Sequence, residues 1–122
     1  MTKMKILCKK CKIELSNSLT ELSDLNLLNE EDKMDFLPIG YIFKSDGEFF
    51  SGTKNKLIIN LKDLLNSTNH SDFRRLNGCC GLDGMDGINT VCNNGHEIAT
   101  VKEDCWMPHC AIIEPNHVLI NW

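Results

Sequence analysis

Residues Ile88 to Val101 read Ile-Asn-Thr-Val-Cys-Asn-Asn-Gly-His-Glu-Ile-Ala-Thr-Val, which predicts a β-hairpin. Its two arms, 88–92 and 96–101, contain the β-branched residues typical of strands, and the Asn-Asn-Gly between them is typical of a tight hairpin turn. Cys92 stands at the tip of this predicted hairpin. A metal ligand at a hairpin tip, facing a Cys-x-x-Cys turn elsewhere in the chain, is the arrangement of a zinc ribbon.

A matching turn lies near the start of the chain, where Cys8-Lys-Lys-Cys11 supplies two thiols. Two thiolates at this spacing can bind one tetrahedral ion because the turn lets both sulfur atoms point inward. The two lysines favour the thiolate form and offset part of the negative charge of a sulfur-rich zinc site. The pattern favours a zinc knuckle over two incidental thiols. It also disfavours a thioredoxin-type dithiol, since no strand–turn–helix pattern follows it.

A third group of thiols lies in the glycine-rich segment 78–87, Gly-Cys-Cys-Gly-Leu-Asp-Gly-Met-Asp-Gly. Adjacent cysteine side chains diverge, so we expect only one of Cys79 and Cys80 to bind the same ion as the other knuckles. We therefore predict a structural zinc ion whose ligands are Cys8, Cys11, Cys80 and Cys92. His96 is an alternative fourth ligand, and the choice between Cys79 and Cys80 stays open.

The segment 104–110, Asp-Cys-Trp-Met-Pro-His-Cys, contains the last candidate group. Cys105, His109 and Cys110 could form a second metal site, or a Cys–His pair could act as a nucleophile. Pro108 prevents a regular helix from placing Cys105 and His109 on one face. A buried turn anchored by Trp106 is the favoured interpretation, because no base with an orienting partner is evident.

The rest of the chain predicts an α+β fold: a small zinc-stabilised domain with antiparallel β-hairpins and two or three short helices. Leucines at a spacing of three favour helix within 18–36, and Asn60 is a candidate N-cap for a helix over 61–66. The predicted strands and turns are a hairpin of 39–43 with 48–52, a strand at 56–60, a helical turn within 69–77 that Ser71 could cap, and strands at 111–114 and 117–121. We predict one domain over 1–122, with the Cys-x-x-Cys strand and the helices in 1–77 and a Cys- and Gly-rich β region in 78–122.

Composition bounds the function and the compartment. The 122 residues are 42% hydrophobic and 25% charged, as in an ordinary globular domain, and the formal net charge of −4 argues against nucleic-acid binding. No apolar stretch is long enough to span a bilayer, and no export signal is evident, so we expect a cytoplasmic protein without membrane contact. Thiols stay reduced there. Seven cysteines, an odd number, then favour metal ligation over a disulfide framework.

The stretch from Arg75 to His109 resembles a group of small bacterial proteins that has no established activity. The resemblance is carried by the strings Gly-Cys-Cys-Gly-Leu-Asp-Gly, Cys-Asn-Asn-Gly-His and Asp-Cys-Trp-Met-Pro-His, together with the N-terminal Cys-x-x-Cys. It implies a bacterial origin and adds no catalytic residue.

These observations predict a non-catalytic zinc-binding protein that acts as a protein-interaction module. A specific form of this hypothesis is an immunity protein that neutralises a bacterial toxin, since an acidic surface suits a basic nuclease. The alternative is a metal- or thiol-dependent enzyme that uses the region of Cys79, Cys80, Cys105 and His109.

Overall fold

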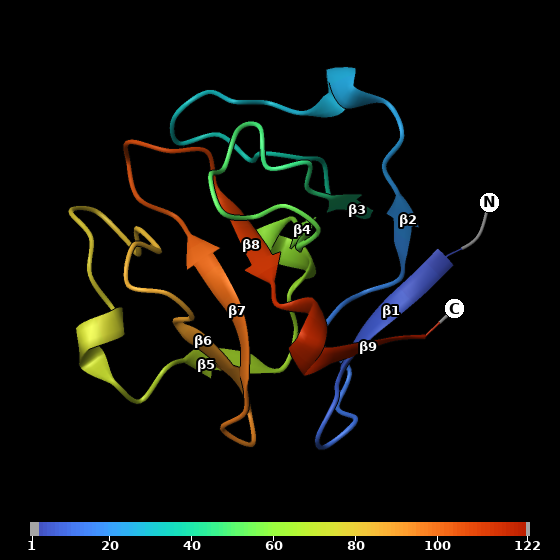
Figure 1. The fold of residues 1–122 in the computed structure, drawn as a ribbon, viewed down its shortest axis with the longest axis vertical. Coiled ribbons are helices and arrows are strands. Elements are labelled where there is room, and N and C mark those ends of the chain that lie inside the picture. The colour runs from blue at the N-terminus through green and yellow to red at the C-terminus, as the bar shows by residue number, and fades with distance from the viewer. Residues whose placement is uncertain (1–2, 122) are drawn as a thin grey trace.

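A computed structural model describes residues 3–121 and shows a curled mixed sheet of nine strands (Figure 1). The strands are β1 (Lys3–Cys8), β2 (Leu19–Glu21), β3 (Tyr41–Lys44), β4 (Leu57–Ile59), β5 (Ser67–Asn69), β6 (Thr90–Cys92), β7 (Glu97–Lys102), β8 (Cys110–Ile113) and β9 (Val118–Asn121). Their order in the sheet is β5-β6-β7-β8-β4-β3-β2-β1-β9. The β2–β3 pair is parallel, and the other neighbouring pairs are antiparallel.

The prediction of an α+β fold with two or three short helices is wrong. The described residues contain four single 3-10 turns and no α-helix: η1 (Leu25–Leu27), η2 (Leu61–Asp63), η3 (Phe73–Arg75) and η4 (Pro115–His117). The leucines at a spacing of three do not share a face, because Leu19 and Leu22 are buried in different apolar clusters. Backbone pairing decides the conformation at the start of this segment: the N–H of Leu22 donates to the carbonyl of Ile42 at 2.8 Å, which holds β2 beside β3, and the rest of 18–36 is loop apart from η1.

Asparagine and aspartate still begin three of the four turns, as their capping chemistry predicts. The Asn60 side chain accepts a hydrogen bond from the N–H of Lys62, so the cap predicted at Asn60 is present, although the turn ends at Asp63. In the 69–77 segment the cap is Asp72, and not Ser71. The residue after the first of these turns, Leu64, is extended, and Leu76 after the second has left the helical region, so capping fixes where the turns begin but cannot lengthen them into helices.

The strand predictions of the second half agree with the structure. β6 and β7 form the antiparallel hairpin predicted for 88–101, and β8 and β9 occupy the apolar runs predicted at 111–114 and 117–121. In the first half, 56–60 contains β4 as expected, but the predicted hairpin of 39–43 with 48–52 is wrong. β3 pairs with β4, with Ile42 opposite Ile59, while residues 48–52 form bends and turns.

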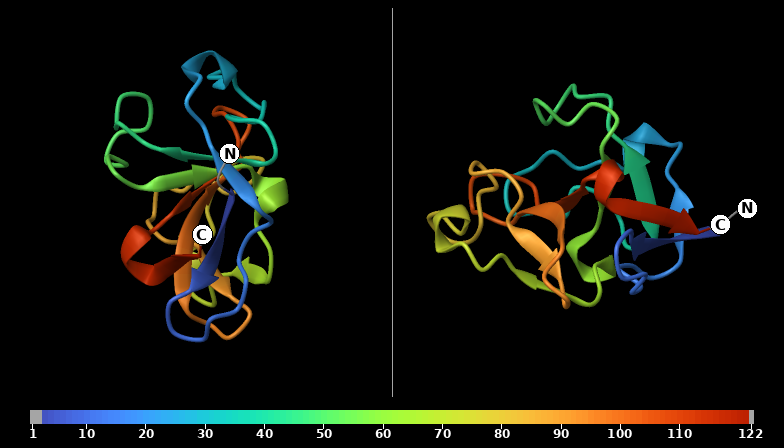
Figure 2. Two further views of the ribbon diagram at one scale, coloured as in Figure 1. Left: turned by 90° about the vertical axis from the view of Figure 1, so that its right-hand side faces the viewer. Right: turned by 60° about the horizontal axis from the view of Figure 1, so that its bottom comes forward.

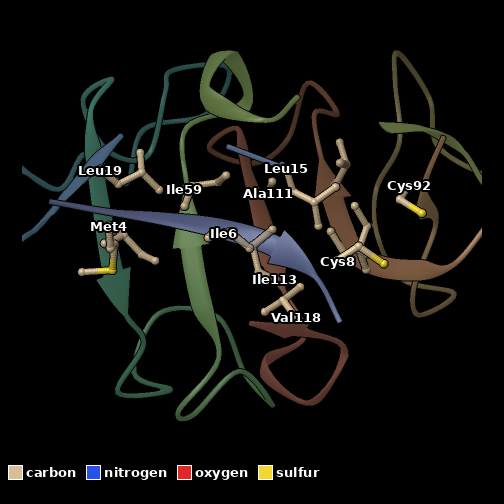
Figure 3. Packing of buried hydrophobic residues seen from close by; sticks show 14 of the residues in the cluster. Met4, Ile6, Cys8, Leu15, Leu19, Ile59, Cys92, Ala111, Ile113 and Val118 are labelled. Atoms are coloured by element: carbon tan, nitrogen blue, oxygen red, sulfur yellow. The ribbon is translucent and has the colours of Figure 1, made fainter. Parts of the chain in front are cut away.

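Apolar side chains cover both faces of the sheet. Residues Ile59 and Ile113 point to the inner face, where β1 lies across the central strands and buries Ile6 against them (Figure 3). Their neighbours Ile58 and Ile112 point to the outer face and pack against Phe36 and other aromatic residues. Since successive side chains of a strand alternate between faces, burial on both faces makes β8 apolar throughout.

The curl of the sheet positions the candidate site. The β6–β7 hairpin lies near one end of the strand order and β1 near the other. The turn that follows β1 and the tip of the β6–β7 hairpin nevertheless lie at the same end of the molecule, at the bottom of Figure 1 and of the left view in Figure 2.

The structure of residues 3–121 contains no helix with the length and apolar character of a membrane span.

Candidate metal centre

Three cysteines and one histidine meet where the turn after β1 faces the β6–β7 tip. The group is Cys8, Cys11, Cys92 and His96, and its ligand atoms all lie within 4.8 Å of one another. The Nδ1 atom of His96 lies 3.5 Å from the Sγ of Cys8 and 3.4 Å from the Sγ of Cys92. The Sγ atoms of Cys11 and Cys92 are 3.8 Å apart. This cysteine–histidine quartet could hold a metal ion.

The backbone of both turns is shaped to present these side chains. In the first turn the N–H of Lys12 donates to the carbonyl of Cys8 at 2.8 Å, and Lys12 adopts a left-handed φ of 65°. In the second, the N–H of Gly95 donates to the carbonyl of Cys92 at 2.8 Å, with φ 86° at Gly95. Each left-handed residue closes a tight turn. The two ligands of each turn are therefore held on the same side of it.

Burial differs across the quartet. Cys8 and Cys92 are fully buried, whereas Cys11 and His96 are partly exposed at the rim. Burial raises the pKa of the Cys8 thiol. The pKa of Cys11 is lowered to about 6, first by a hydrogen bond from the Asn94 side chain and then by the backbone of Ile13. Asn94 belongs to the opposite hairpin, so the Cys11 thiolate is stabilised by the same turn that carries Cys92 and His96.

A second group of thiols lies apart from the quartet and comprises Cys79, Cys80 and Cys105. Cys79 and Cys80 are exposed and Cys105 is partly exposed. We call this group the surface thiol triad. A hydrogen bond with Cys80 and burial raise the pKa of Cys105. These three thiols could also hold a metal ion.

The Asp104 side chain, which is fully buried, organises the surface thiol triad. Its two carboxylate oxygens accept hydrogen bonds from the backbone N–H groups of Cys79, Cys80 and Cys105 at 2.9, 2.8 and 2.7 Å. The indole N–H of Trp106 donates to the same carboxylate at 2.8 Å. The backbone N–H groups of Cys80 and Cys79 are the main cause of the strongly lowered pKa of Asp104.

The structure brings together three of the four predicted ligands, Cys8, Cys11 and Cys92. Cys80 lies in the surface thiol triad, and His96, the alternative fourth ligand, takes the remaining place in the quartet. The other proposed participants of the 104–110 segment do not join either group. His109 has its Nε2 3.1 Å from the Asp104 carbonyl oxygen, and Cys110 is fully buried on the outer face of the sheet.

The sequence places Asp104 beside Cys105 and near a possible Cys–His pair, but it does not indicate that Asp104 shapes the surface thiol triad. Its two other cysteine contacts bridge 24 and 25 positions and depend on the fold. The structure shows all seven cysteines as free thiols.

Comparison with known proteins finds no matching family model, no matching curated protein and no matching solved structure. The resemblance to small bacterial proteins therefore stays a prediction. Function has to be argued from the two cysteine groups and from the surface.

Proposed function

We propose that this protein is a zinc-stabilised, non-catalytic module that binds another protein. The observation that carries the zinc part is the spacing within the cysteine–histidine quartet. Zn–S bonds of about 2.3 Å and Zn–N bonds of about 2.0–2.1 Å in a tetrahedron place two sulfurs about 3.8 Å apart, and a sulfur and a nitrogen about 3.5 Å apart. The quartet has 3.8 Å between Cys11 and Cys92, and 3.4–3.5 Å from His96 to Cys92 and Cys8.

The chemistry of the donors supports zinc as well. Three thiolates and one imidazole nitrogen are a known structural zinc set, whereas calcium and magnesium prefer oxygen ligands. With four protein ligands, the tetrahedron is complete and no open position remains for a water or a substrate. The quartet residues would thus hold the ion in a structural role, and the ion would supply a cross-link between β1 and the β6–β7 hairpin.

The partner-binding part rests on a groove whose lining segments lie at the other end of the molecule, at the top of the ribbon in Figure 1. It has a volume of ≈ 770 Å³ and lies between residues 25–31 and 45–50. Its floor is aromatic: the Phe36 ring stacks on Phe49 at 5.7 Å and meets Phe50 edge-on at 5.0 Å. Phe49 is 41% exposed and Leu27 is 39% exposed, so apolar surface remains open to a ligand.

All charged residues that line the groove are acidic, namely Glu30, Glu31, Asp46 and Glu48. An apolar floor with an acidic rim complements a segment that inserts an aromatic or aliphatic side chain between lysines or arginines. We therefore propose a basic protein as the partner. In its most specific form, the module is an immunity protein that neutralises a basic toxin. The formal net charge of −4 supports this choice of partner.

The experiment compares three immobilised forms of the zinc-loaded protein in native lysate. These are the wild type, the groove variant Glu30→Lys/Glu48→Lys, and the control variant Glu14→Lys/Glu21→Lys, which changes the charge equally at exposed positions outside the groove lining. We expect the wild type and the control to retain the same basic protein and to release it as salt rises, because salt screens exposed charges. The groove variant should not retain it. The partner proposal fails when no protein distinguishes the groove variant from the control.

A further inference from the structure

We infer that the surface thiol triad is a second metal site, one that binds a soft, thiophilic cation at the protein surface. The three thiols come from two loops, 78–81 and 103–106, and their sulfur atoms lie within 4.8 Å of one another. This site is independent of the cysteine–histidine quartet and shares no residue with it.

The backbone of the two loops is fixed before any ion binds. The Asp104 carboxylate accepts N–H donors from both sides of the triad, at 2.7–2.9 Å. Because it is buried and engaged with four donors, it acts as a clamp on the backbone and is not itself a ligand. A metal site whose ligands are held in place loses little conformational entropy when the ion binds.

Two glycines make the close approach possible. A Cβ atom on Gly78 would collide with the carbonyl oxygen of Gly81, and a Cβ atom on Gly81 would lie 2.7 Å from the carbonyl oxygen of Glu103. Only glycine therefore lets the 78–81 turn fold tightly enough to place the adjacent Cys79 and Cys80 beside Cys105. The side chains of adjacent cysteines are expected to diverge, but this turn brings the sulfur atoms of both Cys79 and Cys80 close to that of Cys105.

The type of donor atom indicates the class of ion. At the zinc–thiolate distance of about 2.3 Å, three sulfurs on one ion lie about 3.8–4.0 Å apart, so sulfurs that lie within 4.8 Å of one another need to close by about 1 Å at most. Within the described residues, no fourth histidine, cysteine or carboxylate belongs to the triad. Soft ions such as cadmium or copper(I) accept thiolates as ligands. Binding would displace the thiol protons and leave the ion open toward solvent, since Cys79 and Cys80 are exposed.

The test is a titration of the zinc-loaded protein with cadmium chloride, under a phosphine reductant, followed by native mass spectrometry and by the thiolate-to-cadmium absorption band. We expect two metal ions per chain: cadmium in the triad, and in the quartet either the original zinc or cadmium that has replaced it, because the quartet thiolates also favour a soft ion. Cys80→Ser and Cys105→Ser should each keep one ion per chain, the quartet ion, and bind a second ion roughly 100-fold more weakly. The retained quartet ion shows that these variants fold.

The matched control is Cys110→Ala, which removes a thiol five positions from Cys105 that lies outside the triad. It should bind the added cadmium as the wild type does. A protein that takes up no ion beyond the one in the quartet overturns the inference. A second bound ion that survives in Cys105→Ser overturns it too. Either result concerns only the second ion, so the zinc content measured before the titration still tests the proposed structural zinc separately.

Discussion

The Sγ atoms of Cys11 and Cys92 lie 3.8 Å apart, although 81 positions separate these residues in the chain. One belongs to the turn after β1 and the other to the end of β6, two strands near opposite ends of the sheet order. An ion bound between them would close the curl of the sheet. The cross-link spans most of the chain, so its loss should be felt far from the site.

Removal of one quartet ligand should lower thermal stability strongly. Cys11→Ser leaves an incomplete site, and we expect the melting temperature to fall by about 10 °C or more. The measurement is thermal unfolding by circular dichroism, with and without a chelator. Chelation should lower the melting temperature of the wild type toward that of Cys11→Ser and leave the variant unchanged.

Cys110→Ala is the comparison, since Cys110 is fully buried but belongs to neither cysteine group. Its cost should be that of a small cavity, about 1 kcal/mol, and its response to the chelator should stay that of the wild type. Equal and small effects of the two substitutions would contradict a metal cross-link at Cys11.

Variants at His96 and Cys80 show which of these two residues is the fourth ligand of the quartet ion. Nδ1 of His96 lies within 3.5 Å of two quartet sulfurs, whereas Cys80 belongs to the surface thiol triad. We therefore expect His96→Ala to lose most of its zinc when dialysed against a moderate chelator. Cys80→Ser should keep one zinc per chain, as measured by elemental analysis. The reverse pattern would restore Cys80 as the fourth ligand.

Alkylation should divide the seven cysteines into three groups. With iodoacetamide near pH 8, we expect Cys79 and Cys80 to react first because they are exposed, and Cys105 to follow. The quartet cysteines should react only after chelation. Cys110 should react only after unfolding, because burial raises its pKa to about 12.

Peptide mass spectrometry at successive times reads out this order. A different pattern, in which one thiol reacts far faster than the others, would indicate an activated nucleophile and favour the enzyme hypothesis for Cys79, Cys80, Cys105 and His109. Early labelling of Cys8 in the untreated protein would speak against a bound ion in the quartet.

The Asp104 carboxylate should keep the backbone of the two thiol loops, 78–81 and 103–106, ordered. In Asp104→Asn the amide NH₂ group faces backbone N–H donors in place of an acceptor oxygen, so at least two of the four hydrogen bonds are lost. Amide exchange at Cys79, Cys80 and Cys105 should speed up by roughly tenfold or more. Amide exchange at Ile58 and Ile112 in the core serves as the internal reference. If the amides of Cys79, Cys80 and Cys105 exchange at the same rate in Asp104→Asn as in the wild type, the carboxylate does not hold the loops.

The elements predicted correctly from sequence are those whose signals are local. The Asn-Asn-Gly turn and its β-branched flanks specify the β6–β7 hairpin, and the Cys-x-x-Cys spacing identifies the facing turn. Asn60 caps its turn through a bond to Lys62, only two positions away. These local features were enough to bring Cys8, Cys11 and Cys92 into one predicted site.

The wrong structural predictions lie where contacts between residues far apart in the chain determine the conformation. The leucine spacing in 18–36 imitates a helix face, but Leu22 hydrogen bonds to Ile42, and Leu19 and Leu22 enter opposite sides of the sheet. Cys80 stays a predicted ligand of the quartet ion, but the structure places it beside Cys105, where Asp104 accepts its backbone N–H, and no local pattern in the sequence indicates this contact. A periodic pattern and a glycine-rich loop each admit several structures, and long-range pairing chooses among them.

The zinc content of protein purified without a metal-binding tag, obtained by comparing its native and denatured masses, tests the structural zinc itself. We expect one tightly bound zinc per chain in the wild type and in Cys80→Ser, none in Cys11→Ser, and only weakly held zinc, lost on dialysis against a moderate chelator, in His96→Ala. A wild-type protein that stays folded without zinc, with Cys8 and Cys92 open to alkylation, would contradict it.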